Sequence, residues 1–95
     1  MPVLLLALLF LLAAPALADP PTERYAPAQL RMAHDFLESA RAAEALGETA
    51  RAGKLAWQAS LDARLAWGMT DSEQLRAEAA QVGSSANALI ARLRP

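Results

Sequence analysis

The sequence predicts an all-α protein, an antiparallel helical hairpin with a long second helix, preceded by a cleavable signal peptide. Three observations support this fold class. Alanine, leucine, arginine and glutamate dominate the composition, and β-branched residues are few. From Leu30 onward, apolar residues recur at spacings of three and four, which is typical of helices. Gly47 interrupts this pattern with room for only a short connection, so the second helix must return beside the first.

The signal peptide is predicted over residues 1–18. Residues 3–12, VLLLALLFLL, form an apolar run that is about half as long as a helix that crosses a bilayer. Pro15 interrupts any helix, and the small residues that end at Ala18 suit signal peptidase. We therefore expect cleavage after Ala18 and no stable membrane span afterwards. An uncleaved anchor is the alternative, which the short run disfavours.

The first helix is expected over about 27–46, after an extended entry over 19–24 in which successive prolines exclude helix. Pro27 suits the first helical position, and Tyr25 is placed to pack on Leu30 as a hydrophobic staple. The buried face of this helix is narrow and consists largely of small residues, with apolar positions at Leu30, Ala33, Phe36, Leu37, Ala40 and Ala43.

Gly47 is expected to end the first helix in a left-handed conformation, with Thr49 as the cap of the second helix. We expect the second helix over about 49–92, because its apolar row continues past Gly68. Breaks near 68–70, where Thr70-Asp71-Ser72-Glu73 resembles a capping box, and near 83–85 are the alternative. The members of this row include Leu61, Leu65, Leu75, Val82 and Leu89.

The predicted domain, residues 25–93, is small, and an isolated two-helix hairpin buries little surface. The helices therefore need a third segment, a second copy or another partner to cover them, and we expect a homo-oligomer or a complex with another envelope protein. The nine Lys and Arg and ten Asp and Glu residues are spread along the chain, which argues against nucleic acid as a partner. Without cysteine, the chain has no disulfide, thiolate zinc site or thiol nucleophile.

His34 and Glu38 lie one helical turn apart, with Asp35 beside them, so this face could contact a metal ion. Two ligands on one helix bind weakly, and the sequence offers neither a second histidine nor a cysteine to complete the site. The pattern is more typical of a solvated polar face. We expect no metal and no cofactor.

Asp62, Trp57 and Trp67 are the candidate partner contacts. Asp62 shares a row with Ala59 and Ala66, so it either recognises a partner or makes a buried structural pair, for which the nearest candidates are Arg31, Lys54 and Tyr25. The two tryptophans either anchor a partner or pack against the first helix or a second copy. The sequence leaves both interpretations of the tryptophans open.

No arrangement of nucleophile, base and acid is recognisable, so a non-enzymatic role is expected. The leading hypothesis is a helical interaction module. One alternative is a small ligand- or metal-binding protein that uses His34, Asp35, Glu38 or Asp62. Another is a helix bound to a membrane surface. That alternative requires a basic face beside an apolar one, and the mixture of Arg and Glu argues against it.

One further pattern runs through both predicted helices. It consists of Tyr25, Ala26, Pro27, Leu30, Ala33, Leu37, Ala40, Gly47, Ala50, Leu55, Ala59, Asp62 and Ala63. On these residues the chain resembles a family of Gram-negative envelope proteins that is catalogued as domain of unknown function 4398. The resemblance covers roughly residues 22–80 and implies a periplasmic helical hairpin without assigned chemistry. The chain departs from the family pattern at Gly68 and Gly83, and we expect neither the anchor cysteine nor the appended wall-binding domain that some members have.

Overall fold

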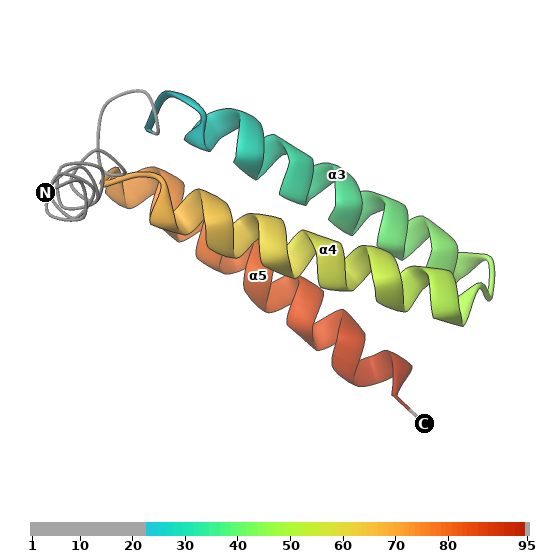
Figure 1. The fold of residues 1–95 in the computed structure, drawn as a ribbon. Coiled ribbons are helices and arrows are strands. Elements are labelled where there is room, and N and C mark those ends of the chain that lie inside the picture. The colour runs from blue at the N-terminus through green and yellow to red at the C-terminus, as the bar shows by residue number, and fades with distance from the viewer. Residues whose placement is uncertain (1–22, 95) are drawn as a thin grey trace, which may run out of the picture.

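The computed structural model describes residues 23–94, and in this range it contains three α-helices and no strand. Helix α3 spans Ala26–Ala45, α4 spans Thr49–Gly68 and α5 spans Glu73–Leu93. Helices α3 and α4 lie side by side in opposite directions, and α5 runs back along them and contacts both (Figure 1). The predicted all-α class is therefore confirmed. The predicted signal peptide and its cleavage site at Ala18 lie outside the described residues.

Helix α3 begins within one residue of its predicted start. Pro27 stands in its first turn, where a missing N–H costs little. Tyr25 occupies the N-cap position and is 62% exposed, so it does not pack as the predicted staple. The extended entry predicted over 19–24 is also wrong at Glu23 and Arg24, which are helical. The remainder of that segment lies outside the described residues.

The turn at Gly47 is as predicted. Gly47 has a φ of +78°, a left-handed conformation that other residues adopt only at a cost. Its N–H donates to the carbonyl of Glu44 at 3.0 Å, and the N–H of Glu48 donates to the carbonyl of Ala43 at 2.9 Å. These two bonds form a Schellman motif, which satisfies the last carbonyls of α3. Helix α4 starts at Thr49 with Glu48 as its N-cap, one residue before the predicted cap.

The predicted single helix over 49–92 is wrong, because α4 ends at Gly68 and the chain reverses over Met69–Ser72. The hydroxyl of Ser72 accepts the N–H of Leu75 at 3.3 Å and caps α5. Folding α5 back buries its apolar face on the hairpin, whereas a continuous helix would leave that face in water. The break predicted as the alternative near 68–70 is present, but α5 continues through 83–85 without interruption.

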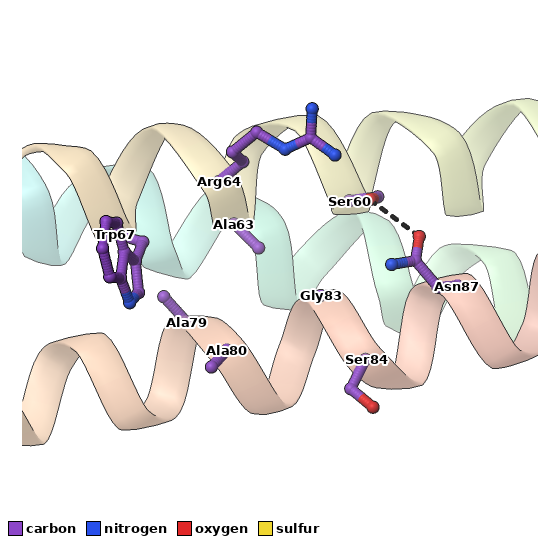
Figure 2. A pocket seen from close by; sticks show the side chains of 9 residues that line it. All are labelled: Ser60, Ala63, Arg64, Trp67, Ala79, Ala80, Gly83, Ser84 and Asn87. Carbon is purple, nitrogen blue, oxygen red and sulfur yellow. Dashed lines mark hydrogen bonds between the residues drawn. The ribbon is translucent and has the colours of Figure 1, made fainter.

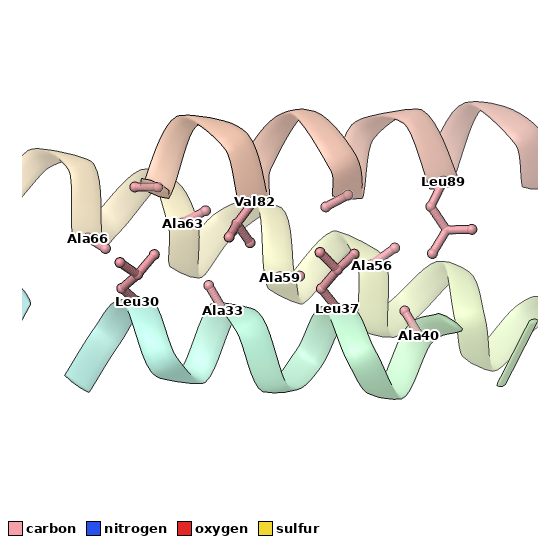
Figure 3. Close-up of a cluster of buried hydrophobic side chains, with 12 residues drawn as sticks. Leu30, Ala33, Leu37, Ala40, Ala56, Ala59, Ala63, Ala66, Val82 and Leu89 are labelled. Atoms are coloured by element: carbon pink, nitrogen blue, oxygen red, sulfur yellow. The ribbon is translucent and has the colours of Figure 1, made fainter. Parts of the chain in front are cut away.

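The core between the helices is built mainly from alanine, with a few larger side chains (Figure 3). Alanine at 0% exposure in the middle of each helix lets the backbones approach closely. The larger buried side chains are Leu30 and Leu37 of α3 and Val82 and Leu89 of α5. The alanines of this core cluster are Ala33 and Ala40 of α3, Ala56, Ala59, Ala63 and Ala66 of α4, and Ala79 and Ala86 of α5.

Polar contacts also attach α5 to both other helices. The guanidinium of Arg92 lies 3.0 Å from the carboxylate of Glu44 on α3, and the Ser60 hydroxyl of α4 donates to Asn87 at 2.9 Å. The third helix therefore supplies the cover that we expected from a second copy. Self-association is therefore no longer expected on the ground that an isolated two-helix hairpin buries too little surface. Among residues 23–94, no helix has the length and apolar character needed to cross a bilayer.

Candidate functional site

Helix α4 is the central element of the candidate site, because it contacts both other helices and still has one side in solvent. Its buried side consists mainly of alanines, whose short side chains leave no group for chemistry. Its larger apolar side chains lie elsewhere on the helix. Trp57 is 58% exposed and Leu65 is 56% exposed, although Leu65 was predicted to belong to the core row.

We define the α4 exposed face as Lys54, Trp57, Leu61, Arg64 and Leu65. These residues are spaced by three and four, which places them within about 100° of one another around the helix. Leu61 is half-buried at the edge of the face, and the other four are exposed. Three apolar side chains, including Trp57, and two cations therefore share one surface of a single helix.

A hollow of about 450 Å³ adjoins Trp57, between the first half of α4 and the end of α5. Apolar side chains from both helices line it, including Ile90 and Leu93 of α5. Lys54 and Arg94 also line it, so cations from both helices border an apolar hollow. The apolar surface around Trp57 thus extends from α4 to α5.

Trp67 is 46% exposed and belongs to a different part of the surface. Its ring lies between α4 and α5, beside a hollow of about 390 Å³ that Ser60, Gly83 and Asn87 also line (Figure 2). The guanidinium of Arg76 stands 4.3 Å from the ring centroid. Arg64 of the α4 exposed face also lines this hollow, and Figure 2 shows its side chain directed away from α5.

A hydrogen-bond network holds the turn between α4 and α5. The carboxylate of Glu23 accepts the Thr70 hydroxyl and the Asp71 N–H, both at 3.1 Å. The Nε of Arg76 donates to the Thr70 carbonyl at 2.7 Å. Thr70 is 3% exposed, so these bonds satisfy buried polar groups of the turn. The network fixes where α4 stops and joins the segment before α3 to the same end of the bundle.

Asp62 is 3% exposed and therefore does not belong to an exposed contact surface. Its Oδ1 accepts the side-chain N–H of Gln58, one turn earlier, at 3.1 Å. Its Oδ2 is buried without a hydrogen-bond partner. The sequence suggested three partners for Asp62, namely Lys54, Tyr25 and Arg31. All three are exposed, and none of them hydrogen-bonds to the Asp62 carboxylate.

His34 and Glu38 lie on the exposed side of α3, beside a hollow between α3 and α5 that Arg41, Glu78 and Val82 also line. Glu38 forms an ion pair with Arg41 at 3.1 Å. Within residues 23–94, no group of three or more His, Cys, Asp or Glu side chains is placed to hold a metal ion. The metal alternative therefore has no built site in this part of the chain.

Sequence reasoning identified Trp57 but missed the cations and leucines that surround it. Leu61 and Leu65 fit the row of three and four residues that was assigned to the core. A usable signal was present, because α4 contains three cations and a single acid, Asp62, which shares the alanine side of the helix. A wheel restricted to residues 49–68 places the α4 exposed face on one side of the helix and the buried alanines on the other.

Comparisons of the chain with protein-family models, with curated proteins and with solved structures find no match. Function therefore has to follow from the geometry of the bundle.

Proposed function

We propose that this chain is a non-enzymatic, helical interaction module of the Gram-negative cell envelope. It is exported through a cleaved signal peptide and acts in the periplasm by presenting the α4 exposed face to a partner. The three-helix bundle is the scaffold of this module, and α4 is its contact element. The resemblance to domain of unknown function 4398 supports the compartment.

The observation that carries the proposal is the position of Trp57. Trp57 is 58% exposed on a rigid helix, so little of its large side chain packs in the core. Tryptophan is enriched among the side chains that dominate binding energy at interfaces. Leu65 extends the same apolar surface two turns further along α4. Together they form the type of surface that marks an interaction site.

The partner is a second copy of the chain or another component of the envelope. A symmetric dimer through α4 would bring Lys54 and Arg64 of one copy close to the same cations of the other. Like charges that face each other across an interface disfavour association. A partner with negative charge fits this face better than a second α4 does.

Site-specific photocrosslinking in intact cells tests the proposal. A benzoylphenylalanine in place of Trp57 or Leu65 should give discrete crosslinked products. The matched control is the same probe at Met32, an exposed apolar residue of α3 that is 48% accessible. Products at all three positions would contradict a specific interaction through α4, and products at none of them would rule out a protein partner of this face.

A further inference from the structure

We propose that the α4 exposed face binds the surface of an anionic phospholipid bilayer. This inference rests on the proposed function, because it names the partner of the same face. The chain would lie on the membrane with α4 parallel to the bilayer plane and its alanine side turned toward α3 and α5. No segment of residues 23–94 would cross the bilayer.

The first observation that supports binding to an anionic bilayer is the distribution of charge around α4. The only acidic residue within α4 is Asp62, which is 3% exposed. Glu48, just before the helix, forms an ion pair with Arg51 at 3.3 Å. Among residues 23–94, Lys54 and Arg64 have no carboxylate within salt-bridge distance. The α4 exposed face therefore carries uncompensated positive charge, which attracts anionic headgroups.

In the sequence, the mixture of Arg and Glu argues against a helix bound to a membrane surface. The structure removes this objection. Arg and Glu alternate along the chain, but the bundle separates them in space. The remaining helical acids of the described residues lie outside α4, at Glu23 before α3 and at Asp35, Glu38, Glu44, Glu73 and Glu78 on α3 and α5. A basic face beside apolar side chains, the requirement for an interfacial helix, is therefore present on α4.

The second observation is the order of apolar and cationic side chains along α4. Trp57, Leu61 and Leu65 form an apolar row, with Lys54 before it and Arg64 within its last turn. Tryptophan favours the boundary between headgroups and acyl chains, and lysine and arginine extend toward headgroups while their stems cover apolar surface. The row is about 12 Å long. These features match a helix that is partly immersed in the interface.

The hollow beside Trp57 extends this surface. Ile90, Leu93 and Arg94 line the hollow together with Trp57 and Lys54. The apolar area available to lipid is therefore larger than α4 alone provides, and so is the positive charge. A protein partner would need an acidic rim around an apolar groove to match the same features, whereas an anionic bilayer presents both without a specific shape.

Tryptophan fluorescence with lipid vesicles tests the inference, because the two tryptophans separate the two surfaces. Trp67→Phe leaves Trp57 as the reporter, and Trp57→Phe leaves Trp67. The chain is expressed from its full sequence and titrated with vesicles of phosphatidylglycerol and phosphatidylcholine, or of phosphatidylcholine alone. We expect a blue shift of Trp57 with the anionic vesicles, a much smaller shift of Trp67, and neither shift with the neutral vesicles.

Charge variants identify the face. Lys54→Gln with Arg64→Gln should lower partitioning onto anionic vesicles by about thirtyfold. Arg31→Gln with Arg41→Gln, which removes two cations from α3, should change it far less. Because all variants are identical before residue 23, any contribution of the preceding segment, whether cleaved or not, cancels in this comparison.

Equal partitioning of the two charge variants, or a blue shift that is the same for both tryptophans, would overturn the inference. Absence of vesicle binding together with a crosslink from position 57 to a protein would also overturn it, and would leave the proposed function standing. Absence of both would remove the proposed function as well.

Discussion

The guanidinium of Arg76 lies over the ring of Trp67, 4.3 Å from its centroid, while its Nε donates to the carbonyl of Thr70 at 2.7 Å. One side chain at the start of α5 thereby binds the end of α4 and the turn between them. This contact holds the chain in the reversed direction that the sequence alone did not specify. The position of α5 in turn determines which side of α4 stays in solvent.

Arg76→Leu should lower the free energy of unfolding by about 1–3 kcal/mol, because it removes a charged hydrogen bond and a cation–π contact. Urea unfolding followed by circular dichroism measures this change. Arg31→Leu is the control, since Arg31 is exposed on α3, and it should change stability by no more than about 0.5 kcal/mol. Equal effects of both substitutions would show that the Arg76 contacts do not hold the turn.

Two glycines should respond in opposite directions to alanine. Gly47→Ala forces a side chain into a left-handed conformation and should cost about 1–2 kcal/mol. Gly83→Ala adds a methyl group at an ordinary 3.7 Å contact with Ala63 inside a helix, so it should stabilise the chain by about 0.5–1 kcal/mol. Thermal melts compare the two variants. Destabilisation by Gly83→Ala would mean that α4 and α5 approach more closely than the structure shows.

A pair of leucines tests which apolar positions are buried. Leu37→Ala should cost about 2–5 kcal/mol, because Leu37 is 4% exposed in the core. Leu65→Ala should change stability by about 0.5 kcal/mol at most, because Leu65 is exposed on α4. Denaturant midpoints measured at several protein concentrations also report on self-association. A large loss in Leu65→Ala that grows with protein concentration would place Leu65 in an interface between copies.

Asp62→Asn should stabilise the bundle by about 1–3 kcal/mol. The carboxylate has one oxygen buried without a partner, and a neutral amide is less costly to bury than a charged group. The asparagine oxygen can still accept the hydrogen bond from Gln58. Asp35→Asn, on the exposed side of α3, is the matched control and should have little effect. A loss of stability in Asp62→Asn would show that the carboxylate has a favourable partner.

The sequence predicted the elements that depend on local chemistry. Pro27 and Gly47 predicted a helix over about 27–46, which agrees with Ala26–Ala45 within one residue, because each favours a particular backbone conformation. It did not predict that the chain reverses after Gly68. Leucines at spacings of three and four continue across that glycine, and the balance between extension and reversal depends on how much surface α5 buries on the hairpin. The exposed position of Leu65 follows from that reversal, so the sequence could not place it either.

Acrylamide quenching of Trp57 in the Trp67→Phe variant is the most direct test of the central claim, that the α4 exposed face is free in the isolated chain and covered by an anionic bilayer. We predict strong quenching in buffer at every protein concentration, and protection on adding vesicles that contain phosphatidylglycerol. Equal quenching with and without these vesicles would contradict membrane binding. Protection that appears without vesicles as the protein concentration rises would show that a second copy covers the face instead.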